Sequence, residues 1–188
     1  MNPTSLSDKD LLAMLIGTRR AERLYRGSLK SLLLEKGMSS TVKCKLNAAQ
    51  ELVRRILQEE LKYRDAMSGP DKVHDYLRLT LGSEEQEVFM VLYLDAQHRL
   101  IEAKELFRGT LNQTNVYPRE VVKYSLKHNA AAVILAHNHP SGVAEPSVED
   151  RLTTKKLKES LRLVGVKVID HVVVGGSSYL SFAEEGMI

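Results

Sequence analysis

The chain has 188 residues, of which 43% are hydrophobic and 27% are charged. These proportions are typical of a globular protein and exclude a long disordered tail, a collagen-like repeat and a coiled-coil rod. The longest unbroken apolar run, residues 130–136, is far shorter than the roughly 20 residues that cross a bilayer. We therefore expect a cytoplasmic protein with no membrane contact, and the single cysteine, Cys44, fits a reducing compartment.

The formal net charge of +3 is unevenly distributed along the chain. Residues 1–69 contain 13 Lys/Arg and 8 Asp/Glu, whereas residues 70–188 contain 14 and 16. A basic N-terminal part could contact nucleic acid, but the same excess spread over about 70 residues is also ordinary for a solvated helical surface. Both interpretations stay open at this point.

Two helices are predicted in the N-terminal part. Residues 5–17 carry Ser7 as an N-cap, have acidic residues in the first turn and stop at Gly17. Residues 46–66 repeat apolar side chains at three- and four-residue steps. The segment Met-Ser-Gly-Pro at residues 67–70 breaks this pattern, and it predicts a boundary between a helical domain over residues 1–66 and a second domain over 67–188.

The second part of the chain alternates strands and helices. Strands are predicted over residues 87–94, 99–106, 130–139, 166–174 and 178–182, with helices from Pro118 to about residue 128 and over 147–164. The strands and helices do not follow a regular period. The sequence therefore predicts an α/β fold with a mixed-sheet sandwich rather than a doubly wound sheet.

Residues of the types that bind metals gather where the strand over 130–139 ends. His137 and His139 are two residues apart, and because side chains alternate along a strand, both imidazoles project to the same face. The Pro-Ser-Gly turn at residues 140–142 allows the next helix to return over the strand end. Asp150, in the first turn of that helix, could then become a third ligand.

Each of these residues also has an ordinary structural interpretation. Ser147 and Asp150 fit the pattern of a helix capping box, and a lone histidine is more often a hydrogen-bonded strand-end residue than a ligand. The combination needs several independent coincidences, which favours a metal site. Two imidazoles and a carboxylate favour zinc over magnesium or calcium, and three protein ligands leave a fourth position where water can be activated near neutral pH.

The segment H-N-H-P-S-G-x-x-x-P-S-x-x-D, residues 137–150, resembles the JAMM motif of the MPN (JAB) metallopeptidase fold. Segments at residues 11–13, 109–111, 116–120 and 170–174 resemble the bacterial RadC family. The resemblance implies an MPN/JAB-like sandwich, layered as in cytidine deaminases, and a zinc-dependent hydrolase of peptide or isopeptide bonds. It further implies that His137, His139 and Asp150 bind the zinc and that Ser147 helps to hold the developing oxyanion.

The same resemblance implies a general base. In the family, a glutamate at the start of the first strand orients and deprotonates the zinc-bound water, and Glu87 opens the strand over 87–94. We assign the base to Glu87 for this reason. Four other carboxylates compete with it, two just before the same strand and two on the next: Glu84, Glu85, Glu102 and Glu105.

Two further features bear on function. His171 follows Asp170 in an apolar strand, so their side chains point to opposite faces, and we expect a structural role for His171. RadC-type proteins commonly carry an N-terminal helix-hairpin-helix with a Gly-apolar-Gly turn that contacts DNA. Residues 36–40 here read Lys-Gly-Met-Ser-Ser without the second glycine, so we expect a degenerate version of that domain.

The alternative function is that of a DNA repair or recombination protein whose metal centre is structural or acts on nucleic acid. Its support is the basic N-terminal part together with the family association. The sequence predicts neither the identity of a peptide or protein substrate nor the oligomeric state.

Overall fold

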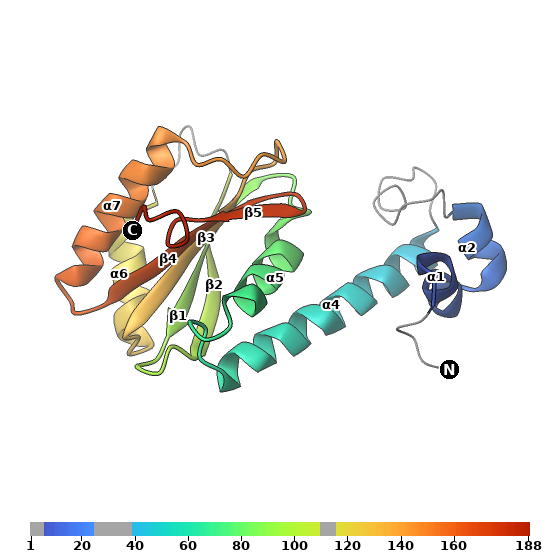
Figure 1. The fold of residues 1–188 in the computed structure, drawn as a ribbon, viewed down its shortest axis with the longest axis horizontal. Coiled ribbons are helices and arrows are strands. Elements are labelled where there is room, and N and C mark those ends of the chain that lie inside the picture. Colours follow the sequence, from blue (N-terminus) through green and yellow to red (C-terminus); the bar gives the residue numbers. More distant parts are fainter. Residues whose placement is uncertain (1–5, 25–38, 110–115) are drawn as a thin grey trace. The chain divides into compact units, whose positions relative to one another are not determined.

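The computed structural model describes residues 6–24, 39–109 and 116–188. The chain divides into two compact units, residues 1–53 and 54–188. Helix α4 (Ser40–Tyr63) runs from the first unit into the second. The figures label the helices and strands named below (Figure 1).

The N-terminal unit contains α1 (Asp8–Ile16), α2 (Thr18–Leu24) and the first part of α4. Helix α1 begins as predicted, because the Ser7 hydroxyl accepts a hydrogen bond from the Asp10 amide. A small core joins the three helices: Leu12, Ile16, Ala21 and Val42. Helix α4 starts at Ser40, earlier than the predicted residue 46, and its first turn contributes Val42 to this core. Residues 36–38 of the predicted hairpin turn lie outside the described residues.

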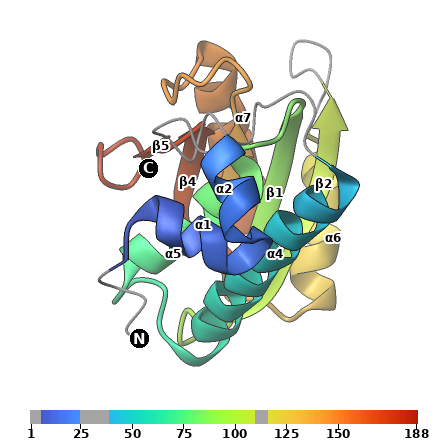
Figure 2. The ribbon, with the colours of Figure 1, turned by 90° about the vertical axis from the view of Figure 1, so that its right-hand side faces the viewer.

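The second unit is built on a five-stranded sheet with the strand order β2-β1-β3-β4-β5. Its strands are β1 (Glu87–Leu94), β2 (Leu100–Gly109), β3 (Ala132–Asn138), β4 (Lys167–Gly175) and β5 (Ser178–Ser181). Only β3 and β4 are parallel, and the other neighbours are antiparallel. Figure 2 shows β1 and β2 toward one edge of the sheet and β4 and β5 toward the other. The mixed α/β sheet predicted from the sequence is confirmed.

Helices cover both faces of the sheet, because alternate residues of the central strands are buried on opposite sides. Val88, Met90 and Leu92 of β1 pack with α5 (Pro70–Leu81) and with Leu61 of α4. Phe89, Val91 and Tyr93 pack with α6 (Pro118–Lys127) and α7 (Val148–Arg162). Figure 1 shows α6 and α7 on one side of the sheet and α5 on the other.

Helix α5 was not among the predicted elements, although its signals are in the sequence. Pro70 occupies the first turn, and the buried residues Val73, Leu77 and Leu81 recur at helical spacing. The Met-Ser-Gly-Pro segment was interpreted only as a boundary, whereas its proline also starts a helix. None of the helices that the structure describes combines the length and apolar composition needed to cross a bilayer.

The packing of α7 against the sheet can be tested with two leucines of that helix. Leu157 is fully buried, so Leu157→Ala should lower the free energy of unfolding by about 2–5 kcal/mol. Leu152 is 61% exposed, so Leu152→Ala should change it by less than about 0.5 kcal/mol. Urea unfolding of both variants makes the comparison, and equal destabilisation by the two substitutions would contradict the packing.

Candidate metal centre

The centre begins at the end of β3. His137 lies opposite Phe89 of β1 and packs on the α7 face of the sheet, where its ring centroid is 6.4 Å from that of Phe89. The chain then leaves the sheet, and the His139 amide donates to the Val174 carbonyl at 2.8 Å. His137 and His139 approach each other with their Nε2 atoms 3.1 Å apart. The predicted convergence of the two imidazoles is thus present.

The loop between β3 and α7 passes closely over the end of β4. A Cβ atom on Gly175 would lie 2.6 Å from the Ala144 amide nitrogen and 2.7 Å from the Gly142 carbonyl oxygen. Only glycine therefore leaves room for the loop here. Gly142 itself has a φ of 82°, a conformation that suits glycine in the turn. This close approach directs the chain back toward the strand end.

The first turn of α7 carries the third candidate ligand. Ser147 caps the helix, because its hydroxyl accepts from the Asp150 amide at 3.1 Å while the Asp150 carboxylate accepts from the Ser147 amide at 2.7 Å. The Ser147 hydroxyl also donates to Asp150 Oδ2 at 2.7 Å. The predicted capping box is therefore formed, and it orients a carboxylate that is 5% exposed.

The three side chains converge closely enough to hold a metal ion. Asp150 Oδ1 lies 3.2 Å from His137 Nε2, and Asp150 Oδ2 lies 3.4 Å from His139 Nε2. Taken with one ligand atom from each residue, the three atoms all lie within 4.8 Å of one another. Within the described part of the chain, this is the one group of His, Cys, Asp or Glu residues close enough to hold an ion.

Hydrogen bonds and neighbouring charges orient His139 and shift the pKa values of His139 and Asp150. The His139 Nδ1–H donates to the Val143 carbonyl at 2.9 Å, which directs Nε2 toward Asp150. The hydrogen bond to Asp150 raises the pKa of His139 against the effect of burial. Burial opposes ionisation of Asp150, but its contacts with the imidazoles of His137 and His139 hold the pKa of its carboxyl well below the usual range.

Glu87 opens β1 near the centre. Phe89 pairs with His137, and Glu87 lies two residues beyond that pair, where β3 has ended at Asn138. Because side chains alternate, Glu87 shares the face of Phe89 and His137. The hydrogen bond with Asp150 is the main cause of the raised pKa of His139, and the charge of the Glu87 carboxylate adds to it.

The four competing carboxylates are placed differently. Glu84 and Glu105 both form ion pairs with Arg108. Glu102 lies opposite Tyr93, four residues along β1 from Phe89 and therefore about 13 Å from the level of His137. Glu85 is exposed and precedes β1. Of the five carboxylates considered, Glu87 shares the face of Phe89 and His137, and its charge acts on His139.

Two further residues lie close to the centre: His171, for which a structural role was expected, and Thr154, which the sequence analysis did not single out. His171 of β4 is fully buried, and its Nε2 lies 2.8 Å from His137 Nδ1, while its own Nδ1 lies 2.6 Å from Thr154 Oγ1. Burial keeps the pKa of His171 well below its ordinary value. Asp170 points away, as predicted, and accepts hydrogen bonds from Ser181 and from the Ala183 amide. The sequence signal for Thr154 was its position one turn after Asp150.

Asn138, between the two histidines, joins the end of β3 to the start of β1. Its Oδ1 accepts from the Val88 amide at 2.7 Å, and its Nδ2 donates to the carbonyls of Glu84 and Gln86 at 3.2 and 3.0 Å. The side chain is 2% exposed, so these bonds are shielded from water. Asn138 therefore holds the strand end from which Glu87 extends.

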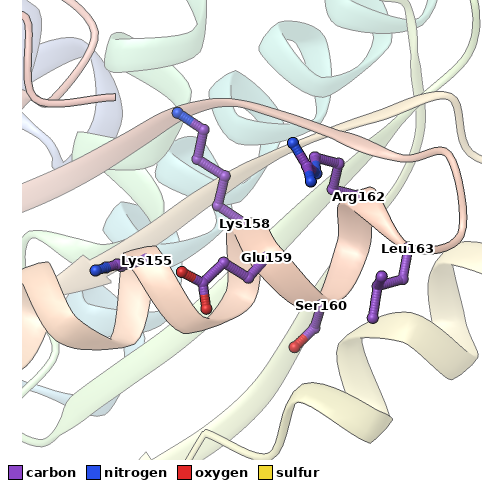
Figure 3. A pocket seen from close by; sticks show the side chains of 6 residues that line it. All are labelled: Lys155, Lys158, Glu159, Ser160, Arg162 and Leu163. Atoms are coloured by element: carbon purple, nitrogen blue, oxygen red, sulfur yellow. The ribbon is translucent and has the colours of Figure 1, made fainter.

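One surface hollow lies apart from this centre. It measures about 600 Å³ and is lined by residues of α7 and the turn after it: Lys155, Lys158, Glu159, Ser160, Arg162 and Leu163. Figure 3 shows Lys158 and Arg162 on one side of the helix and Ser160 and Leu163 on the other. None of these residues belongs to the His137, His139 and Asp150 group, so the hollow is no part of the candidate site.

Comparison with known proteins places this chain in a family. The model of the RadC-like JAB domain matches residues 67–187. The chain belongs to the RadC-like JAB domain family. UPF0758 proteins of Dechloromonas aromatica and Nitrosomonas eutropha are 49% and 50% identical to it over 206 and 203 residues, which cover 99% and 98% of this chain and 91% of each relative.

A third RadC-like relative, the UPF0758 protein of Thiobacillus denitrificans, is 57% identical over 141 residues, 75% of this chain and 63% of that protein. The first two alignments are longer than this chain, so those relatives contain residues that have no counterpart here. The designation of the relatives states no activity. The mixed α/β fold with its helical N-terminal region is the one expected of a JAB domain.

The three hydrogen bonds of the Asn138 side chain, the Asn138 clamp, predict that substitutions at two asparagines differ in their effect on stability. Asn138→Asp replaces an amide donor by an acceptor that faces two carbonyls, so it should lower the free energy of unfolding by about 1–3 kcal/mol. Asn129 is exposed, and Asn129→Asp should be nearly neutral. Chemical denaturation measures both, and an Asn138→Asp variant as stable as the control would show that the clamp is unimportant.

Zinc binding at this RadC-like centre should stabilise the fold, because the ligands join β3 to α7. At a free zinc concentration 100 times the dissociation constant, the gain should be about 2.7 kcal/mol, visible as a higher Tm that a chelator reverses. Asp150→Asn should abolish the zinc-dependent rise. Glu149→Gln, in the same helical turn but exposed, should keep it. The same zinc response in Asp150→Asn would contradict the assignment.

Proposed function

We propose that this RadC-like protein is a zinc-dependent hydrolase of the JAMM type that cleaves a peptide or isopeptide bond. The observation that carries the proposal is the convergence of the His137 and His139 imidazoles and the Asp150 carboxylate, whose ligand atoms, one from each residue, all lie within 4.8 Å of one another. Membership of the JAB domain family agrees with a hydrolase. Three protein ligands are also the number that catalytic zinc sites use.

His137, His139 and Asp150 would hold the zinc through two nitrogens and one oxygen. When bound, zinc supplies a Lewis acid that lowers the pKa of a coordinated water to about 7 and polarises the substrate carbonyl. The low pKa of Asp150 means that this ligand is ionised at any physiological pH, so no proton must be removed from it before metal binding.

Glu87 is proposed to act as the general base. Its carboxylate shares a face with His137, and its charge acts on His139, so we infer that it accepts a proton from the attacking water and returns that proton to the leaving amine. It lies at the start of β1, which the Asn138 hydrogen bonds fix relative to β3. Glu87 and His137 are thereby held on adjacent strands.

Ser147 is proposed to stabilise the oxyanion. Its hydroxyl proton is directed to Asp150 Oδ2. With a metal held by Asp150, the Ser147 hydroxyl would be the nearby donor for the negative charge that develops on the substrate carbonyl oxygen. Ser147 is exposed, so a substrate can reach it.

A peptide or protein substrate and a cytoplasmic location are part of this proposal. The location is supported by Cys44, a free, exposed thiol, which is the state that a reducing compartment maintains.

The proposal predicts that metal binding and turnover can be separated. Wild-type protein should contain about one zinc per chain, measured by elemental analysis after reconstitution and dialysis, and His137→Ala should lose it. Glu87→Gln should retain the zinc and lose about 100- to 10,000-fold in the rate of cleavage of an isopeptide-linked or peptide reporter library. Glu85→Gln is the matched control, since Glu85 is exposed two residues earlier.

Three results would count against the proposal. If the protein takes up no stoichiometric zinc, the proposal of a zinc-dependent hydrolase is wrong. Full turnover in Glu87→Gln would show that another carboxylate is the general base. Cleavage or salt-dependent binding of duplex or forked DNA, with no amide hydrolysis, would favour the nucleic-acid alternative.

A further inference from the structure

A chain of buried hydrogen-bonding groups runs behind the metal centre. It starts at His137 Nδ1 on β3, passes through both ring nitrogens of His171 on β4 and the hydroxyl of Thr154 on α7, and ends at the backbone carbonyl of Asp150. The three steps measure 2.8, 2.6 and 2.6 Å. His137 and His171 are fully buried and Thr154 is 4% exposed. The chain therefore links two of the candidate ligands away from water.

The direction of every proton in this chain follows from its last member. The Asp150 carbonyl has no proton to give, so the single hydroxyl proton of Thr154 must be donated to it. Thr154 Oγ1 is then left as an acceptor, and His171 Nδ1 must carry a proton to reach it. His171 is fully buried against the rings of Phe89 and Phe182, which favours an uncharged imidazole, so its Nε2 is an acceptor and the proton between the two histidine rings belongs to His137 Nδ1.

This arrangement of protons decides the state of His137 Nε2, the ring nitrogen opposite Nδ1. With its proton on Nδ1, a neutral His137 has a free lone pair on Nε2, the atom that faces His139 and Asp150. Metal-binding histidines commonly donate their second N–H to a carboxylate, a carbonyl or water. Here the acceptor is an uncharged imidazole, which fixes the tautomer without adding negative charge beside the ion.

His171 is itself held from both sides. The ring of Phe182 lies 4.8 Å from it, centroid to centroid, and the ring of Phe89 meets it edge-on at 5.8 Å. These contacts leave the imidazole little freedom to rotate or to exchange His137 for water. Thr154 lies one turn after Asp150 on α7, so the same chain also fastens the first turn of that helix to β4.

We propose that His171 and Thr154 are positioning residues of the metal centre: they hold His137 with Nδ1 protonated and Nε2 free, and they hold the Asp150 turn over the end of β3. The inference rests on the proposed zinc site and adds to it two residues outside the set of ligands. Without the Thr154 hydroxyl, His171 loses the acceptor for its Nδ1 proton. If that proton moves to Nε2, it opposes the His137 Nδ1 proton, and His137 must change tautomer and protonate the nitrogen that binds metal.

The test uses three variants of the full chain. Thr154→Val keeps the shape of the side chain and removes the hydroxyl, whereas Thr154→Ser keeps the hydroxyl. Ser125→Ala is the matched control, because Ser125 is also buried in a helix and donates to the carbonyl four residues earlier, at 2.8 Å, on α6. Zinc affinity is measured by competition with a chromophoric chelator, and the ring tautomers by long-range ¹H–¹⁵N spectra of the metal-free protein.

We expect Thr154→Val to bind zinc about 10- to 100-fold more weakly than wild type, and Thr154→Ser and Ser125→Ala to stay within about threefold. In metal-free wild type and in Thr154→Ser, His171 should be protonated on Nδ1 and not on Nε2. Unchanged affinity in Thr154→Val, or His171 protonated on Nε2 in wild type, overturns the inference. If zinc binds to neither protein, the hydrolase and the inference fail together. If wild type binds zinc and cleaves an amide while Thr154→Val binds as tightly, only the inference fails.

Discussion

The return of α7 onto the end of β3 is the constraint on which the candidate site depends. β3 and β4 are parallel neighbours, so the chain between them must cross back along the sheet, and α7 makes that crossing. Leu157 and Leu161 anchor the helix to the sheet by burial among Val133 and Leu135. The start of the helix therefore meets the end of β3, where the two imidazoles project. Asp150 in the first turn of the helix faces them.

Several residues serve local structure and the site together. Asp150 closes the capping box of α7 with the same carboxylate that faces the imidazoles. Thr154 bonds to a carbonyl of its own helix and to a ring on β4. Because helix capping and sheet packing already order these groups, a metal would find its ligands close to their bound arrangement and would cost little conformational entropy to bind.

Sequence reasoning succeeded where the chemistry is local. The parity of His137 and His139 follows from strand geometry, and the capping box of Ser147 and Asp150 follows from a four-residue pattern. β1 has the predicted bounds because a run of β-branched and aromatic residues is bounded by polar ones. Helix α5 was missed although Pro70 and its apolar spacing were readable, since the same proline also fitted a linker.

The sequence by itself determined which side chains could form a metal centre, because residue type, strand parity and the distance to the next helix start are properties of short segments. Only the tertiary structure decided which distant groups serve those side chains. His171 lies 34 residues from His137 and reaches it because β4 pairs with β3 in one particular register, and Glu87 is brought to the face of His137 because β1 pairs with β3 from the other side. Register between strands is set by the packing of whole faces against helices, and no local pattern contains it.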